Sequence, residues 1–66
     1  MTITIKSETI NGYKICIEQE KYSTGYIVED IPQINGDIYG YPISRNYYST
    51  LEKARRRYNT LKRKYK

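Results

Sequence analysis

Hydrophobic and polar residues alternate along two segments near the start of the chain. Over residues 2–9, Ile3 and Ile5 alternate with threonine, lysine and glutamate; over residues 13–20, Tyr13 and two isoleucines alternate with lysine, cysteine and glutamate. Alternation with a period of two is typical of a strand that buries one of its faces. We therefore predict strands over both segments, each with its isoleucines on the buried face.

The segment between these strands, Ile-Asn-Gly at 10–12, is typical of a hairpin turn. A two-residue loop of asparagine and glycine would place Ile5 opposite Glu18, so the isoleucines of the two strands would lie on opposite faces of the sheet. A three-residue loop over 10–12, with Gly12 at positive φ, would instead pair Ile5 with Ile17. Because burial of one face selects the register, we predict the three-residue loop.

Further strands are predicted in the middle of the chain. A turn over 22–25 leads into an apolar segment at 26–30, which predicts a third strand. Pro32 has no N–H to donate to a strand ladder, so pairing is expected to stop there or to move to a sheet edge. A second Ile-Asn-Gly, at 34–36, predicts a short hairpin that returns through a strand over 38–41.

A helix is predicted at the C-terminal end. Ser49 and Glu52 have the spacing of a capping box, in which each side chain bonds a backbone amide at the start of the helix. After Ser49, five residues recur at spacings of three and four and form one apolar stripe: Leu51, Ala54, Tyr58, Leu61 and Tyr65. We predict a helix over 49–64 whose stripe lies on the Ile/Tyr face of the sheet.

These elements predict one α+β domain over residues 1–66: a small antiparallel sheet of three to four strands with one C-terminal helix packed on one face. Sixty-six residues are too few for two separate cores. Ten isoleucines and nine tyrosines, with no phenylalanine or tryptophan, favour strands. The predicted core includes Tyr13, Tyr58 and either Tyr26 or Val28.

Composition excludes several classes of protein. No run of about 18 apolar residues is present, so no membrane span is predicted. The first ten residues lack the basic start and apolar stretch of a signal peptide, so a cytoplasmic location is expected. A single cysteine, Cys16, cannot form an internal disulfide, and the chain has no histidine, the residue most often used as a general base or metal ligand. We expect no enzymatic activity, no catalytic residue, no metal and no cofactor.

Charge is distributed unevenly along the chain. Residues 45–66 carry nine lysines and arginines against Glu52 alone, whereas residues 1–44 carry three lysines against six acidic residues; the net charge is +5. Such asymmetry indicates a polyanionic partner for the C-terminal third.

Basic residues and tyrosines supply the candidate binding residues. The basic candidates for nucleic-acid or polyanion binding lie on the predicted helix away from its apolar stripe, or shortly before the helix: Lys53, Arg56, Arg57, Arg63, Lys64 and Arg45. Exposed aromatic rings beside basic residues can stack on bases or anchor a protein partner. The candidates for stacking or for such an interface are Tyr39, Tyr41, Tyr47 and Tyr48.

The sequence therefore predicts a small non-enzymatic module that binds nucleic acid through its basic C-terminal helix. The alternative is a protein-interaction or inhibitor module, such as a phage-type or accessory protein, that docks on an acidic partner. Either could act as a monomer or as a homodimer.

The predicted order of three strands followed by one helix is similar to that of AP2-type and integrase arm-binding domains. That similarity in element order implies binding of DNA by the sheet. Here, however, the polar faces of the first two strands carry acidic residues such as Glu18 and Glu20, which argues against binding through the sheet.

Overall fold

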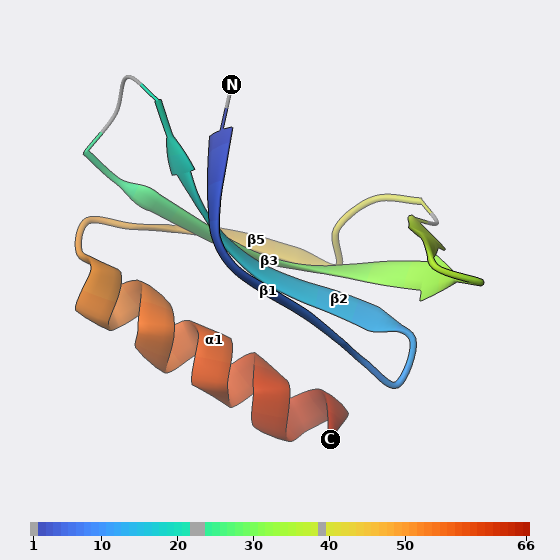
Figure 1. The fold of residues 1–66 in the computed structure, drawn as a ribbon. Helices are drawn as coiled ribbons and strands as arrows, with labels where there is room; N and C mark the ends of the chain where they lie inside the picture. Colours follow the sequence, from blue (N-terminus) through green and yellow to red (C-terminus); the bar gives the residue numbers. More distant parts are fainter. Residues whose placement is uncertain (1, 22–23, 39) are drawn as a thin grey trace.

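The computed structural model describes residues 2–21, 24–38 and 40–66. A curled antiparallel sheet is packed against one C-terminal helix, which confirms the predicted α+β class (Figure 1). The elements in chain order are β1 (Thr2–Ile10), β2 (Tyr13–Glu20), β3 (Tyr26–Ile34), β4 (Asp37–Ile38), β5 (Ser44–Tyr48) and α1 (Leu51–Tyr65). Within the described ranges, no helix is both long enough and apolar enough to cross a membrane.

Strand β3 organises the sheet. It pairs with β2 on one side, and β2 pairs in turn with β1 at the sheet edge. Strand β5 pairs with the first half of β3, and the two-residue β4 pairs with its end. The third strand is thus longer than predicted, and β5 has no counterpart among the predicted strands. The fourth strand, expected over 38–41, is observed only at Asp37–Ile38, and Tyr39 lies outside the described residues, as do residues 22–23 of the predicted second turn.

Pro32 lies inside β3, where the sequence predicted an interruption or an edge. The backbone amide of Gln33 donates to the Gly12 carbonyl at 2.7 Å, toward the β1–β2 hairpin. Successive amides of a strand point to opposite sides, so the nitrogen of Pro32 faces away from the β1–β2 hairpin. On that side the β5 pairing has ended at Asp30 and the β4 pairing begins at Gln33. The proline therefore occupies a gap between two partner strands, where no donor is required.

The predicted three-residue loop between β1 and β2 is wrong. Ile10 pairs with Tyr13, so the loop contains only Asn11 and Gly12, at φ 49° and 83°. Two successive positive φ angles define the type I′ turn, whose twist matches that of a strand pair and which Asn-Gly favours. The same geometry recurs in the β3–β4 turn at residues 35–36.

A β-bulge in β1 explains why the loop was predicted wrongly. The prediction assumed that β1 pairs with β2 without interruption, which a two-residue turn would not allow if the isoleucines of both strands shared one face. The pairing shifts between Thr4 and Lys6, so one extra residue of β1 stands opposite β2. On the turn side of the bulge, Lys6 and Glu8 lie opposite core isoleucines of β2. Ile3 and Ile5 are 55% and 39% exposed, so the prediction that they lie on the buried face is also wrong.

The core lies between the sheet and α1. Its fully buried members come from β2, β3 and the helix stripe: Ile15, Ile17, Val28, Ala54, Tyr58 and Leu61. Burial of Val28 and Tyr58 confirms these two predicted core residues, whereas the predicted core residue Tyr13 is not part of this cluster. Tyr26 packs at the margin of this core, and Tyr13 is half-buried, with its ring stacked on that of Tyr65 at a centroid distance of 4.2 Å.

The helix begins one residue later than its capping box predicted. Thr50, not Ser49, is the N-cap residue, and its side chain accepts a hydrogen bond from the Lys53 amide at 3.3 Å. Glu52 then cannot return a capping bond from the third helical position. It instead pairs with Arg56 one turn along the helix, at 3.1 Å.

Candidate nucleic-acid interface

Helix α1 presents a cationic surface on the side that faces away from the sheet. Its apolar stripe is buried against β2 and β3, so most of its basic side chains project into solvent. The exposed cations are Lys53, Arg55, Arg56, Arg63, Lys64 and Lys66, while Arg57 and Lys62 are half-buried.

Few of these charges are neutralised within the chain. In the part of the chain that the structure describes, two ion pairs involve them: Arg56 with Glu52, and Lys62 with Glu8 at 3.5 Å. The Arg56–Glu52 pair is an exposed pair on one helix face, which contributes only about 0.3–0.5 kcal/mol. Arg56 can therefore exchange this partner for a phosphate at little cost.

A shallow, open groove lies between the end of β5 and residues 53–60 of α1. It has a volume of about 400 Å³ and is lined by Tyr48, Lys53, Arg56, Arg57 and Thr60. The four helical residues lie at spacings of three and four, so they share one face of α1. The groove therefore combines three cations, one aromatic ring and one hydroxyl group.

Arg57 forms part of the groove wall and pairs with no carboxylate in the described ranges of the chain. Its Nη2 lies 3.5 Å from Ser44 Oγ, and its Nε is buried with no hydrogen-bond partner among the described residues. Ser44 in turn bonds Asp30, so Arg57 reaches a carboxylate only through a hydroxyl group. A guanidinium that is partly removed from water and not directly paired favours an incoming anion.

Asp30 links β3 to the start of β5 and to the end of α1. The fully buried carboxylate accepts hydrogen bonds from the Ser44 amide at 2.8 Å, from the Ser44 hydroxyl and from the Tyr65 hydroxyl. Burial opposes ionisation of Asp30, but the bonds from Ser44 and Tyr65 outweigh it and lower the pKa of this carboxyl. Asp30 thereby ties the start of β5 to the end of α1.

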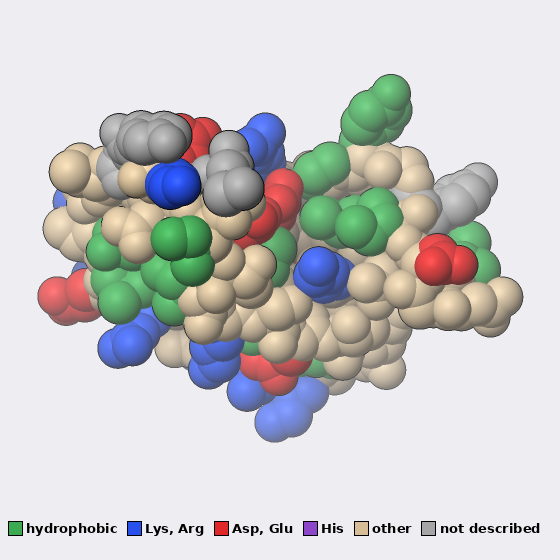
Figure 2. Space-filling model, turned by 45° about the horizontal axis from the view of Figure 1, so that its top comes forward, with side chains coloured by type: hydrophobic (Ala, Val, Ile, Leu, Met, Phe, Trp, Pro, Cys, Tyr) green, Lys and Arg blue, Asp and Glu red, His purple; other side chains and the backbone are tan. Residues whose placement is uncertain are grey.

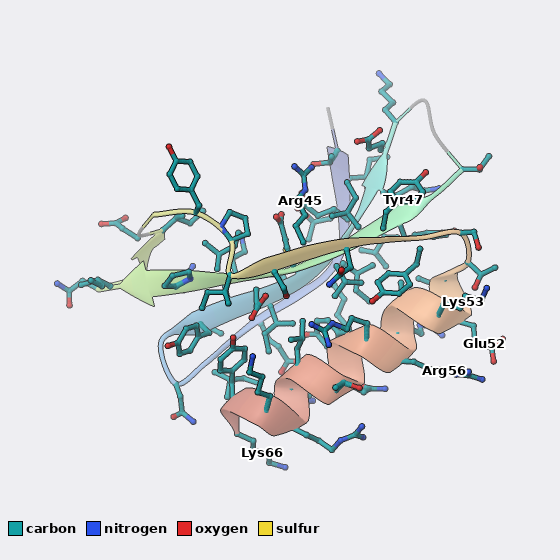
Figure 3. All side chains as sticks on the ribbon, turned by 180° about the vertical axis from the view of Figure 1, so that it is seen from behind. Arg45, Tyr47, Glu52, Lys53, Arg56 and Lys66 are labelled. Carbon is teal, nitrogen blue, oxygen red and sulfur yellow. The ribbon has the colours of Figure 1, made fainter. Side chains whose placement is uncertain are left out.

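Strand alternation separates the residues that the sequence grouped before the helix. Tyr48 lines the groove on the helix side of β5, whereas Arg45 and Tyr47 lie on the other side of the same strand (Figure 3). Arg45 points its Nε toward Glu29 Oε2 at 3.8 Å. Tyr41 is 89% exposed, and Tyr39 lies outside the described residues.

The structure thus brings together Lys53, Arg56, Arg57 and Tyr48 among the predicted residues. Arg63 and Lys64 extend the cationic surface toward the C-terminal end of α1, while Arg45 does not join it. Sequence reasoning missed Ser44, Thr60 and Asp30. The segment Ser-Arg-Asn-Tyr-Tyr at 44–48 has no period-two alternation of apolar and polar residues, so no local pattern indicated the β5 strand or its two faces.

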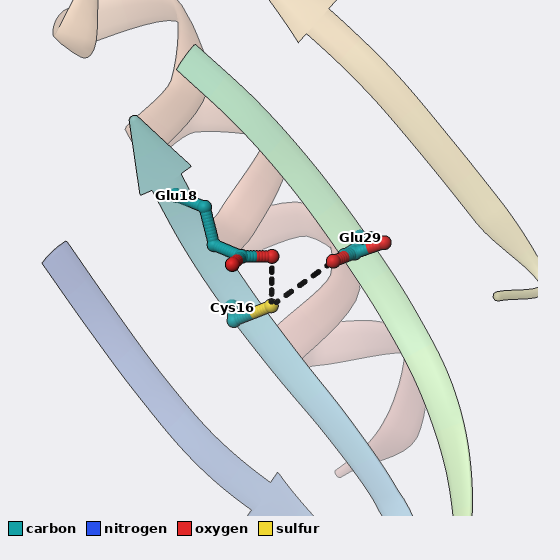
Figure 4. A group of neighbouring side chains, drawn as sticks. All are labelled: Cys16, Glu18 and Glu29. Carbon is teal, nitrogen blue, oxygen red and sulfur yellow. Dashed lines mark hydrogen bonds between the residues drawn. The ribbon is translucent and has the colours of Figure 1, made fainter. Parts of the chain in front are cut away.

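The face of the sheet away from α1 carries a buried group of Cys16, Glu18 and Glu29 (Figure 4). Cys16 pairs with Glu29 across β2 and β3, and its thiol donates to Glu18 Oε1 at 3.7 Å and Glu29 Oε1 at 3.9 Å. Glu18 also accepts a bond from the Thr2 hydroxyl at 2.7 Å. Cys16 is only 2% exposed and Glu29 only 9%, so this group is largely removed from water.

The two carboxyl groups hold a proton near neutral pH. The hydrogen bond with Glu18, burial and the Glu18 charge together raise the pKa of Glu29 to about 7. Burial, followed by the charges of both glutamates, raises the pKa of the Cys16 thiol to about 12. The three ligand atoms lie within 4.8 Å of one another, so the group could hold a metal ion, but only after the thiol loses its proton.

Figure 2 tilts the molecule so that its top in Figure 1, away from the helix, comes forward. Acidic side chains lie near the middle of this view, and hydrophobic side chains gather toward both ends, one of them the β4 end. Ile34, Ile38 and Ile43 are each more than half exposed, as is Tyr41. This side therefore differs in charge and polarity from the cationic helix surface.

Replacing Glu29 with glutamine is expected to stabilise the protein above pH 7 by about 1–3 kcal/mol. Because the pKa of Glu29 is raised on folding, the wild-type free energy of unfolding should fall as pH rises from about 4.5 to about 7. Glutamine cannot ionise, so this decline should disappear in Glu29→Gln. Urea denaturation at several pH values measures it.

Glu20→Gln is the matched control, because Glu20 lies on the same sheet and is exposed. It should leave the pH profile of stability unchanged. A Glu29→Gln profile that parallels the wild type between pH 5 and 8 would contradict the shared proton.

Comparison with known proteins found no matching family model, no matching curated protein and no matching solved structure.

Proposed function

We propose that this protein is a non-enzymatic module that binds nucleic acid through the cationic surface of α1. The observation that carries the proposal is the exposed row of lysines and arginines along the helix, of which only Arg56 and Lys62 form ion pairs in the described structure. Such a row neutralises phosphates and releases their counterions, which is the main source of sequence-independent affinity.

The distribution of charge gives the molecule a polarity that fits this proposal. The cations lie on the helix, while Glu18 and Glu29 lie on the opposite face of the sheet. A polyanion is attracted to the first surface and repelled by the second. The protein should therefore approach nucleic acid with its helix and not with the open face of the sheet.

The proposal is tested by fluorescence anisotropy with labelled single-stranded DNA, RNA and duplex DNA at two salt concentrations. We expect micromolar or tighter binding, with a log–log salt slope of about −4 to −7. A variant in which Lys53, Arg56, Arg63 and Lys64 are all replaced by glutamine should keep its circular dichroism spectrum, because these side chains are exposed. Its salt slope should become shallower by about 3–4, because each cation that neutralises a phosphate adds about one to the slope.

The control replaces two cations away from the helix, Lys14 of β2 and Lys21 just after β2, with glutamine and should bind almost as the wild type does. No wild-type binding at low salt would overturn the proposal. Equal losses of affinity in the helix and sheet variants would remove the helix as the binding surface.

A second candidate function, protein interaction, is favoured by the exposed hydrophobic residues Ile34, Ile38, Tyr41 and Ile43. An acidic protein partner would also use the cationic helix. Poly-glutamate that displaces DNA at equal charge concentration would favour such a partner, and light scattering would detect a homodimer.

A further inference from the structure

The groove between β5 and α1 offers more than positive charge. Tyr48 contributes an aromatic ring from the strand, and Lys53, Arg56 and Arg57 contribute cations from the helix. Proteins that bind single strands combine a cationic groove along the backbone with aromatic rings on which bases stack. We propose that this groove binds a single-stranded nucleic acid, with its phosphates on the helix and one base on Tyr48; the inference rests on the proposed function.

The dimensions of the groove suit a short stretch of one strand. Residues 53–60 span seven steps along the helix, or about 10 Å at 1.5 Å per residue. At about 3.4 Å per nucleotide along a stacked strand, this length matches about three nucleotides. Thr60 marks the far end of the groove, where its hydroxyl donates to the Arg56 carbonyl at 3.0 Å.

Tyr48 makes the groove selective for a single strand. Its ring is held by partial burial against the core, so it lines the groove in a fixed position. A base in a duplex is already stacked on both faces and paired at its edge, so it would have to leave the duplex to reach this ring. An unpaired base can stack without that cost.

The wall opposite the ring supports contact with a phosphate. Arg57, which has no direct carboxylate partner among the described residues, lies on the helix wall opposite and would gain one charge-assisted bond from a phosphate.

Two double variants of equal charge test the location of the site. Lys53→Gln with Arg56→Gln removes two cations from the groove, and Lys64→Gln with Lys66→Gln removes two from the C-terminal end of the helix, outside the groove. With a labelled 12-nucleotide single strand of DNA, the affinity of the groove variant should fall at least about tenfold further than that of the other. Both variants keep Arg57, which contacts Ser44.

Tyr48→Leu tests stacking while it keeps an apolar side chain at the margin of the core. Single-strand affinity should fall about 5- to 100-fold, the range expected for loss of one stacked base. The salt slope should stay unchanged, because no charge is removed. Binding to a duplex of the same sequence should be nearly unaffected, and the wild type should prefer the single strand.

The outcomes separate this inference from the proposed function. Binding that falls equally in the two charge variants, or a wild-type preference for duplex, overturns the groove site and leaves nucleic-acid binding intact. Absence of binding to every nucleic acid overturns both. If Tyr48→Leu does not fold, the charge-matched variants and the strand preference still decide the question.

Discussion

Replacing Asp30 with alanine is expected to lower the free energy of unfolding by about 3–5 kcal/mol, because several hydrogen bonds to a buried charge disappear together. The carboxylate accepts bonds from the amide and hydroxyl of Ser44 and from the hydroxyl of Tyr65. Its removal leaves these donors buried without an acceptor. A domain of this size has a total stability of only about 3–10 kcal/mol, so the substitution should remove a large part of it.

Urea denaturation followed by circular dichroism measures this effect. Asp37→Ala is the matched control, since Asp37 is exposed on β4, and it should change stability by less than about 0.5 kcal/mol. An Asp30→Ala variant as stable as the control would show that this network does not hold the fold.

Asp30 also predicts a pH dependence opposite in sign to that of Glu29. The pKa of Asp30 is lowered in the folded protein, so its stabilising contribution is present above its unfolded pKa. That contribution is lost as pH falls through its folded pKa, below about 4. In Asp30→Asn this acid-induced loss should be reduced, which thermal unfolding between pH 2 and 5 would show.

Local sequence signals predicted the elements whose causes lie within a few residues. The apolar stripe of α1 follows from spacings of three and four, and the positions of both Asn-Gly turns, though not the length of the first loop, follow from residues that tolerate positive φ. The N-cap is displaced by one residue because Ser49 and Thr50 are both competent caps, and only the path of the chain after β5 selects between them.

Long-range pairing could not be predicted in the same way. The register of β1 depends on a bulge at Ile5, and a bulge has no local signature that distinguishes it from continuous alternation. The assumption that every isoleucine of β1 is buried therefore selected the wrong turn. For the same reason, the sequence did not predict that Glu8 and Lys6 of β1 lie on the face of the sheet toward the helix.

The candidate site was predicted in composition but not in arrangement. Cations on the outer face of α1 follow directly from the helical wheel, whereas the groove requires β5 beside the helix. Arg45 and Tyr47 could be placed only after β5 was recognised as a strand, because alternation sends them to the acidic face. The role of Asp30 could not be predicted either, because its hydrogen-bond partners lie 14 and 35 residues away in the sequence.

The contact of β1 with the helix gives the second large effect, in Tyr58→Ala. Tyr58 is among the largest fully buried side chains, and truncation should cost about 3–5 kcal/mol through reduced burial and the cavity left behind. Its hydroxyl donates to Glu8, and Lys6 Nζ lies 5.0 Å from the centre of its ring. Truncation would therefore also loosen the edge strand.

Tyr58→Phe separates the two contributions, because it keeps the ring and removes the hydroxyl. The bond from Tyr58, more than the nearby Lys62, lowers the pKa of Glu8. In Tyr58→Phe the pKa of Glu8 should rise toward its ordinary value, as measured by NMR titration, while the fold persists. An unchanged Glu8 pKa would mean that Lys62 and Lys6 alone hold this carboxylate, and that the helix contacts β1 through packing rather than through the hydroxyl.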